Sequence, residues 1–247
     1  MIPISPGRSR RATLAGAVCA LLVAGTALTG CSEDPNEGTN GVGRLPADQI
    51  QTKAQKAAAS VGTVRLHGSV QTSGRTYTLD MRLKPQGGIG SVSTAGETFR
   101  LLRVGQELYL KADAAFWGKG GNGDGDSKAA DKLASKYVKV PKGDPSYTKF
   151  IGLTDKNVLL GGLLTLHGEL STDGHHEQDG TRTVRVTGDD GAGGTLDVSL
   201  EGKPYPLRLV RAGEAGTLTF SSWGADFKLE KPAKGDTLDY GKQLPTS

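Results

Sequence analysis

Short runs in which apolar and polar residues alternate one by one are the feature that most restricts how this chain can fold. The runs at residues 64–70, 77–83 and 107–111 carry apolar side chains at alternate positions, with Gly68 at one of these positions in the first run. Successive side chains of a β-strand point to opposite faces of a sheet, so each run predicts a strand with one apolar face. Glycines lie between many of these runs, as hairpin turns require residues that tolerate positive φ. Further alternating runs occur at residues 183–186, 195–200, 207–210, 217–220 and 227–229.

One run departs from this alternation. Phe99 to Val104 has apolar residues at both parities. Such a strand either contains a bulge or is covered on both faces, and the sequence leaves both readings open.

Helical patterns interrupt the strands at two places. Residues 45–61 repeat apolar side chains at helical spacing on one narrow face, and Gly62 follows. Thr154 and Asp155 are typical of a helix N-cap, ahead of a leucine-rich helix that is apolar nearly all round and is therefore expected to be buried. Residues 128–136 form a short helix-like run, and the tail from Lys231 has no periodic signal. The order of helix, strands, buried helices and strands predicts an α+β fold in which a curved antiparallel sheet packs helices in its concave face.

The N-terminus has the properties of an export signal. Three arginines precede an apolar stretch from about residue 12 to residue 28, which is too short and too rich in Ala, Gly and Thr for a permanent membrane span. The stretch ends in Leu28-Thr29-Gly30-Cys31, which resembles the lipobox of bacterial lipoproteins. The resemblance implies cleavage between Gly30 and Cys31, and a diacylglyceryl group on Cys31. The alternative is an ordinary signal peptide in which Cys31 is incidental, and the choice between Sec and twin-arginine export stays open.

The charge gives no indication of a nucleic-acid-binding protein, and the cysteine content gives none of a disulfide-stabilised one. The whole chain has a net charge of +4, but the signal holds three arginines and no acid, which leaves 27 Lys and Arg against 26 Asp and Glu. This balance gives no reason to expect nucleic-acid binding. The second cysteine, Cys19, lies within the signal, so no disulfide is expected in the mature chain.

These boundaries divide the chain into four parts. Residues 1–30 are expected to be a lipoprotein signal peptide, and residues 31–44 a polar, flexible tether that contains Pro35. Residues 45–240 are expected to form one domain, and residues 241–247 a tail.

Several segments of the domain carry a family resemblance. These are the opening helix running into residues 64–70, Ala114 to Trp117, Tyr137 to Pro141, the leucine-rich helix near residue 160, and Leu218 to Gly224. In pattern and order they resemble the mycobacterial LppX/LprG lipoproteins of the LolA-like half-barrel class. The resemblance implies an apolar cavity for the acyl chains of envelope lipids between the concave face and its helices, and it supplies no catalytic motif.

A half-barrel would place alternate strand residues inside, against the leucine-rich helix. The alternative is that the same side chains form a solid core. The expected lipid-binding candidates are Leu66, Val70, Leu79, Met81, Leu108, Leu110, Leu159 and Leu163.

No other motif indicates a metal, a cofactor or catalysis. Gly118 to Gly123 fits the letters of a dinucleotide fingerprint, but no βαβ pattern surrounds it, and the following Asp-rich stretch lacks the closing Glu of a calcium loop. His175 and His176 are expected at a solvated hairpin tip. Trp117 and Trp223 are expected as buried anchors. No nucleophile motif is found, so the chain is not expected to be an enzyme.

The sequence therefore predicts a lipoprotein anchored at the extracytoplasmic face of the cell membrane. It would bind and carry or present an acylated envelope lipid or lipoprotein, with a transporter or another envelope protein as its partner. The alternative is a sensor or regulatory module that uses the same fold to bind a partner protein. The sequence leaves open the identity of the ligand, its donor and acceptor, and the oligomeric state.

Overall fold

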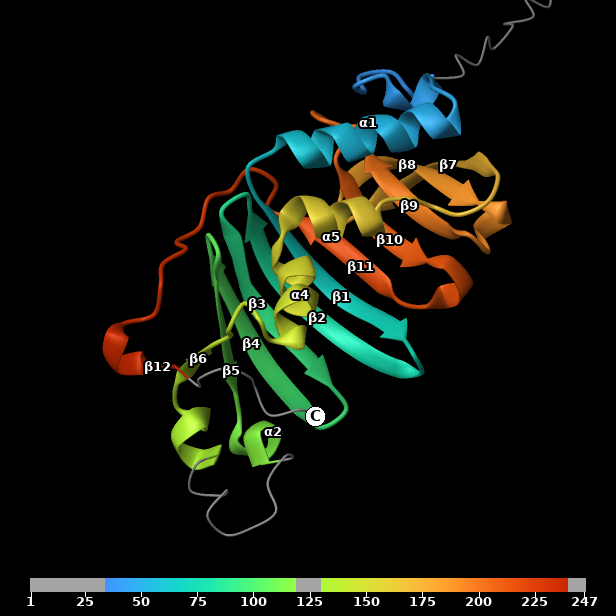
Figure 1. The fold of residues 1–247 in the computed structure, drawn as a ribbon. Coiled ribbons are helices and arrows are strands. Elements are labelled where there is room, and N and C mark those ends of the chain that lie inside the picture. Colours follow the sequence, from blue (N-terminus) through green and yellow to red (C-terminus); the bar gives the residue numbers. More distant parts are fainter. Residues whose placement is uncertain (1–33, 119–129, 240–247) are drawn as a thin grey trace, which may run out of the picture. The chain divides into compact units, whose positions relative to one another are not determined.

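The computed structural model describes residues 34–118 and 130–239. The chain divides into two units, Met1–Asp34 and Pro35–Ser247, and every described helix and strand belongs to the second. Its core is a single twelve-stranded sheet with helices on one face (Figure 1). The strands are β1 (Val64–Thr72), β2 (Arg75–Lys84), β3 (Gly87–Thr94), β4 (Glu97–Val104), β5 (Glu107–Ala112), β6 (Tyr137–Lys139), β7 (Leu170–Gln178), β8 (Thr181–Gly188), β9 (Gly194–Ser199), β10 (Pro206–Arg211), β11 (Thr217–Ser221) and β12 (Thr237–Asp239).

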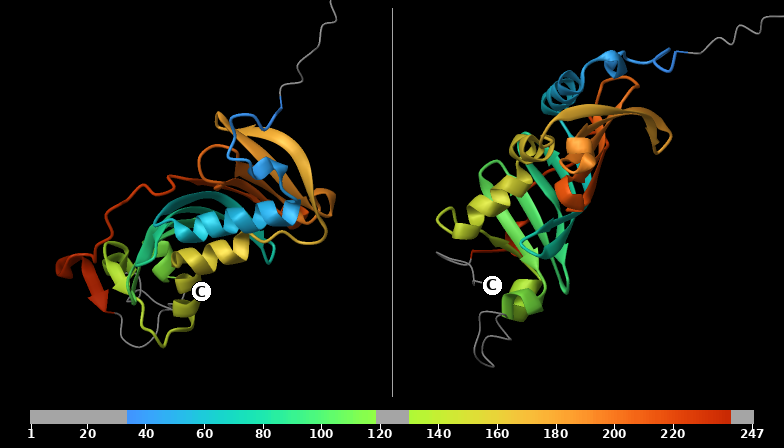
Figure 2. Two further views of the ribbon diagram at one scale, coloured as in Figure 1. Left: turned by 90° about the horizontal axis from the view of Figure 1, so that it is seen from above. Right: turned by 90° about the vertical axis from the view of Figure 1, so that its right-hand side faces the viewer.

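The strands follow the order β12-β6-β5-β4-β3-β2-β1-β11-β10-β9-β8-β7. Neighbouring strands are antiparallel except for β12 and β6, which are parallel. The sheet curls around the helices, so one face is concave and the other convex (Figures 1 and 2). The predicted α+β class with a curved antiparallel sheet is confirmed.

The helices divide the concave face between them. The α-helices are α1 (Ala47–Ser60), α2 (Ala114–Gly118), α4 (Pro145–Thr154) and α5 (Lys156–Leu163). Helix α1 covers β7 to β10, α4 covers β3 to β5, and α5 lies between α1 and α4 (Figure 2). Residues 130–134 form a further helical turn. Short 3₁₀ segments are η1 (Val42–Arg44), η2 (Asp189–Gly191), η3 (Ala212–Glu214) and η4 (Lys234–Asp236). None of the helices in the described residues is long and apolar enough to cross a membrane.

The helix boundaries have local causes. Helix α1 buries Ile50, Ala54 and Ala58, the narrow apolar face that the sequence predicts. The carboxylate of Asp155 accepts hydrogen bonds from the backbone N–H groups of Asn157 and Val158, each at 3.1 Å, which confirms the predicted N-cap of α5. Asp144 caps α4 in the same way and precedes a proline at the first helical position.

A glycine at one position lets neighbouring strands approach closely. Gly90 in β3 faces the concave side between Met81 and Leu101. A side chain at Gly90 would collide with the Asp80 carbonyl oxygen and the Met81 sulfur. The backbone can therefore approach its neighbour closely only because this residue lacks a Cβ.

The segment expected as a flexible tether is ordered in its described part. The backbone N–H of Asn40 donates to the Leu200 carbonyl at 2.8 Å, its side chain donates to the Ser199 carbonyl at 3.0 Å, and Val42 is buried. The prediction of a tether over residues 31–44 is therefore wrong for residues 35–44. Hydrogen bonds to the end of β9 and the burial of Val42 together hold this polar segment against the domain.

Other segments also differ from expectation. His175 and His176 lie within β7, and the turn falls later, at Asp179 and Gly180. Residues 227–229 form no strand, whereas the tail beyond Lys231 contains β12. Phe99 to Val104 keeps a regular register with both neighbours, so it has no bulge; residues 101–103 are buried on both faces, whereas Arg100 is exposed.

Candidate functional site

The candidate site is the concave face of the sheet beneath α4 and α5. One transverse row of this face crosses seven strands in register. The row consists of Phe220, Leu66, Met81, Gly90, Leu101, Leu110 and Val138. All of these except glycine are buried apolar side chains, so the floor of the site is dry.

The eight lipid-binding candidates fall into two groups. Leu66, Met81, Leu108 and Leu110 expose no surface and Leu79 only 3%, so these five are packed on all sides. The other three, Val70, Leu159 and Leu163, are half-buried and pack against the margin of this core. The structure therefore separates a solid floor from a looser apolar margin.

Helix α5 is less enclosed than the sequence indicates. Leu160 and Leu164 are buried, but Val158 is 62% exposed. The prediction that this helix is buried is thus wrong for one of its sides. The apolar side chain of Val158 on that side of α5 does not pack into the core.

Aromatic side chains fill the end of the concave face near α2. Phe99 of β4 lies with its ring centroid 5.9 Å from that of Phe116 and 5.6 Å from that of Phe150. Trp117 is buried beside Phe116, as expected of an anchor. Trp223 is instead half-buried and stacks on Tyr205, with the ring centroids 4.9 Å apart.

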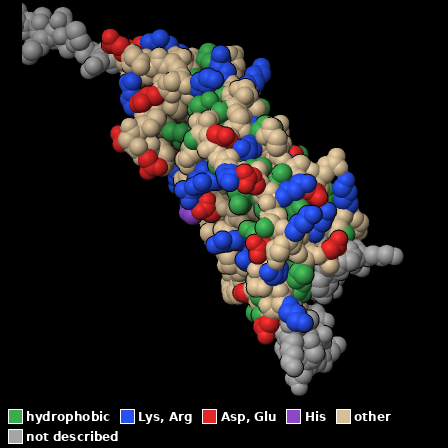
Figure 3. Space-filling model, turned by 90° about the vertical axis from the view of Figure 1, so that its left-hand side faces the viewer, with side chains coloured by type: hydrophobic (Ala, Val, Ile, Leu, Met, Phe, Trp, Pro, Cys, Tyr) green, Lys and Arg blue, Asp and Glu red, His purple; other side chains and the backbone are tan. Residues whose placement is uncertain are grey.

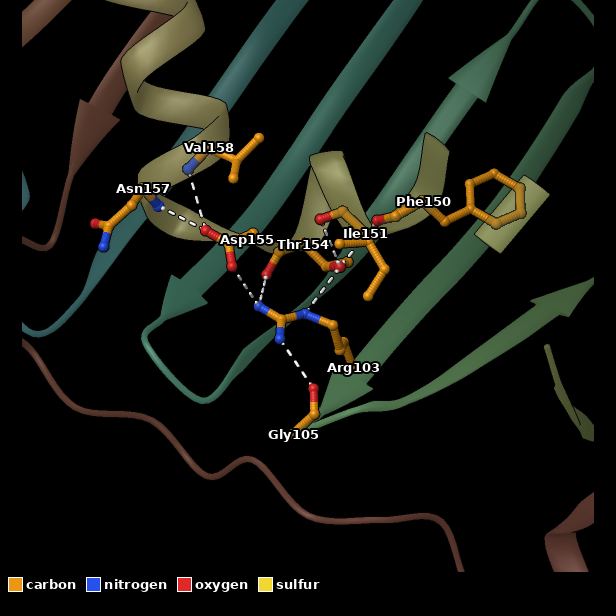
Figure 4. A network of polar contacts seen from close by, with 8 residues as sticks. All are labelled: Arg103, Gly105, Phe150, Ile151, Thr154, Asp155, Asn157 and Val158. Carbon is orange, nitrogen blue, oxygen red and sulfur yellow. Dashed lines mark hydrogen bonds and ion pairs between the residues drawn. The ribbon is translucent and has the colours of Figure 1, made fainter. Parts of the chain in front are cut away.

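A buried arginine ties the junction of α4 and α5 to the sheet (Figure 4). Arg103 of β4 points into the concave face, where its guanidinium donates to the Thr154 and Gly105 carbonyls, both at 2.9 Å, and to the Thr154 hydroxyl at 3.2 Å. Asp155 lies at 3.4 Å and supplies a carboxylate for the charge. The side chain of Arg103 thus satisfies the end of α4 and holds the start of α5.

A buried lysine ties the same junction to α1. Lys156 is 1% exposed, and its ammonium donates to the carbonyls of Ala58 and Ala59 at 2.9 and 3.0 Å. Burial lowers the pKa of Lys156 below its usual value, opposed by the neighbouring Asp155. Arg103 binds residues 154 and 155, and Lys156 is the next residue along the chain. Residues 154–156 therefore form the polar corner at which the helix pair is attached to the sheet and to α1.

Beside this corner, α1 and α5 border a pocket of about 270 Å³. Its lining residues are Gln55, Ala59, Asn157, Leu160, Gly161, Leu164 and Thr165. A Cβ added at Gly161 or Gly162 would meet no atom within 4 Å. The last turn of α5 is therefore loosely surrounded.

The motifs considered for metals do not assemble a site. In β7, the ring of His175 contacts the Asn36 side chain at 3.1 Å, and that of His176 contacts the Asp173 carbonyl at 2.7 Å. Among the described residues, no group of three or more His, Cys, Asp or Glu side chains is placed to hold a metal ion. The glycine-rich loop at residues 119–129 and the lipobox lie outside the described residues.

Comparisons with known proteins decide the fold. No family model matches the chain, and no curated protein matches its sequence. Among solved structures, LprF from Mycobacterium bovis superposes with a TM-score of 0.52 at 19% identity, over 76% of this chain and 97% of LprF. The chain has the fold of LprF. The lipoprotein LppX from Mycobacterium tuberculosis gives a TM-score of 0.43 at 16% identity, over 74% of this chain and 98% of LppX. The predicted structural resemblance to this group of lipoproteins is thereby confirmed at the level of the fold.

Proposed function

We propose that the chain is a lipoprotein, anchored through Cys31 at the extracytoplasmic face of the cell membrane, that binds the acyl chains of an envelope lipid or lipoprotein. The lipobox pattern supports the anchor, and the LprF fold together with the apolar concave face supports the ligand class. The protein would carry or present this molecule by burial, without bond chemistry. A transporter or another envelope protein would receive it.

The observation that carries this proposal is the way in which α4 and α5 are attached. Arg103 and Lys156 hold the helix pair at one polar corner, whereas the rest of α5 meets the core through apolar side chains, buried Leu160 and half-buried Leu159 and Leu163. Apolar contacts are non-directional, so α5 can shift on this margin without breaking a hydrogen bond to the sheet. An acyl chain would insert under α5, over the floor formed by the five packed candidates.

The energy of such binding comes from the ligand's methylenes. Each CH₂ that leaves water contributes about 0.8 kcal/mol. A chain that moves from a bilayer into the protein loses this favourable free energy unless the protein site is as free of water as the bilayer. The buried row beneath α5 meets that condition, which makes a bilayer lipid a reasonable cargo.

Neighbouring positions on α5 provide a matched test of the acyl site. Leu159→Glu would place a carboxylate at the apolar margin and should weaken uptake of a fluorescent fatty acid at least about tenfold, because the charge cannot be desolvated beside the chain. Val158→Glu changes the adjacent, 62% exposed residue and should bind like the parent. Both variants are measured in the mature chain carrying Cys31→Ala, and native mass spectrometry of the same protein would reveal a co-purified acyl molecule.

Two results would contradict the acyl site. One is equal uptake by Leu159→Glu and Val158→Glu. The other is a parent protein that is always empty and takes up no fatty acid and no vesicle lipid. In either case, the alternative function, binding of a partner protein on the same fold, would replace lipid carriage.

The anchor has its own test. Cys31→Ala should abolish metabolic fatty-acid labelling and release the protein from the membrane fraction, since no other cysteine follows position 31. Cys19→Ala, which changes the cysteine within the signal, should leave labelling intact. Labelling that survives Cys31→Ala would show that the lipobox resemblance is incidental.

A further inference from the structure

The convex face of the sheet, opposite the helices, carries a row of polar side chains. Strand register places them side by side across seven strands. The row consists of Lys111, Arg100, Ser91, Asp80, His67, Thr219 and Arg208. Figure 3 shows the side of the molecule that faces left in Figure 1, where Lys and Arg side chains lie among Asp and Glu side chains.

Like charges stand opposite one another on this face. Arg65 is the Cα partner of Arg82, and Arg100 is the partner of Lys111. Cross-strand pairs of like charge destabilise a sheet, so the arrangement has a cost that packing does not explain. Within the described residues, the exposed Arg82 and Arg100 form no ion pair.

The first of these pairs borders a pocket of about 180 Å³. The pocket is lined by Val64, Arg65, Arg82, Ser222, Ala225, Asp226 and Phe227. Its volume is below the roughly 300 to 1,000 Å³ of sites for drug-sized ligands, and it suits a small anionic group.

The guanidinium groups in this pocket are prepared for an anion. Asp80 accepts two hydrogen bonds from Arg65, at 2.9 and 2.8 Å, which fixes the orientation of that guanidinium. The carboxylate of Asp226 at the rim is engaged by the Lys84 ammonium at 2.8 Å, and this contact lowers the pKa of Asp226. Arg82 is left to receive a ligand, and arginine binds phosphate through paired N–H donors.

Cations outnumber carboxylates in the convex rows. The mature chain is nearly neutral, with 27 Lys and Arg against 26 Asp and Glu. The row through Asp80 continues from Arg208 to Asp197 and Arg185, and a second convex row runs from Arg65 and Arg82 to Lys139. The two rows hold seven cations but only two carboxylates, Asp80 and Asp197, so the remainder of the chain is net acidic. The seven cations are Arg65, Arg82, Arg100, Lys111, Lys139, Arg185 and Arg208.

We propose that this basic convex face docks onto an anionic lipid surface, with the Arg65/Arg82 pocket holding a headgroup phosphate. The proposal deepens the proposed function and rests on it in one respect, because the anchor at Cys31 would keep the domain next to such a surface. Charge complementarity identifies the occupant: each basic residue near an anionic membrane adds favourable binding free energy. The concave face then stays free to hold an acyl chain.

Vesicle binding tests the proposal on the mature chain with Cys31→Ala, so that the anchor makes no contribution. At about 0.1 M salt, where the screening length is about 10 Å, the protein should sediment with vesicles of phosphatidylglycerol and phosphatidylcholine in equal parts, but not with phosphatidylcholine alone. Arg82→Gln and Arg100→Gln should each weaken binding about fivefold. Arg75→Gln removes the same charge from the opposite parity of β2 and should have no effect.

Three outcomes would overturn the proposal. They are equal binding to both kinds of vesicle, unchanged binding by the Arg82→Gln/Arg100→Gln double variant, and tighter binding to polyglutamate than to the anionic vesicles, which would indicate an acidic protein partner. Fatty-acid uptake measured on the same variants separates this test from the acyl site. Fatty-acid uptake should be unchanged in both arginine variants. If the parent takes up no fatty acid, the acyl site is contradicted, but the vesicle-binding result still tests the docking face.

Discussion

At the scale of single residues, two buried cations hold the site and neither has a sequence signal. A charged residue at either position would normally be expected to face water. Arg103 lies in β4, which has apolar residues at both parities, and Lys156 lies in the first turn of α5. Most of their partners are backbone carbonyls, which every residue supplies. Only the tertiary structure reveals which carbonyls end a helix beside them.

Lys156 gives a prediction at this scale. Lys156→Met keeps the bulk of the side chain but leaves the Ala58 and Ala59 carbonyls without their donor, so it should lower the free energy of unfolding by about 1 to 3 kcal/mol at neutral pH. The pKa of Lys156 is lowered in the folded state, so the unfolded state binds more protons as pH approaches 10.5. The stability of the parent therefore rises in that window relative to the variant, and the difference should widen.

Urea unfolding of both proteins from neutral pH towards 10.5 measures this difference. Lys149→Met, at an exposed position on α4, controls for the loss of one lysine and should change little. A difference that is absent at neutral pH would show that Lys156 does not make these bonds, and one that narrows as pH rises would show that folding raises the pKa of Lys156 instead of lowering it.

At the scale of elements, the regular strands and capped helices could be predicted and the irregular ones could not. The β1 and β2 strands alternate cleanly because one face is buried and the other is wet. In contrast, β3 begins with Gly-Gly-Ile-Gly, a sequence that is typical of a turn. Its glycines are there because the backbone of β2 comes very close to Gly90, and they contribute no side chain to the core. Strand β12 has only three residues, too few for any period to appear.

The candidate site shows the same division. Strand alternation correctly placed Leu66, Leu79, Met81, Leu108 and Leu110 on one buried face. It could not distinguish a packed floor from a cavity wall, because both require apolar side chains at the same spacing. The half-burial of Leu159 and Leu163 depends on how far α5 stands from the sheet, which is set by the corner at residues 154–156. The distance between α5 and the sheet cannot be predicted from the local sequence.

At the scale of the whole folded unit, the segment after β11 links the middle of the sheet to its far edge. It leaves β11, passes Lys84, and ends as β12 beside β6 (Figure 1). Ion pairs hold it along this course, most clearly where Glu107 of β5 contacts both Lys231 and Lys139, the latter at 2.9 Å. These two ammonium groups lower the pKa of Glu107 to about 2. The Glu107 carboxylate is therefore one of the contacts that hold the C-terminal segment, together with the ion pairs Lys84–Asp226 and Lys136–Asp236.

Acid titration of this contact is the prediction at that scale. Because the pKa of Glu107 falls from 4.5 to about 2 on folding, its stabilising contribution should be present in full above pH 4.5 and be lost as pH falls through about 2. Glu107→Gln should therefore raise the amide exchange rates of β12 above pH 4.5, and the difference from the parent should vanish near pH 2. Glu230→Gln removes a carboxylate of the same segment that pairs with Lys228 instead, and should leave β12 protected. Equal protection of β12 in the parent and in Glu107→Gln at neutral pH would mean that backbone pairing with β6, rather than the charge of Glu107, holds the segment in place.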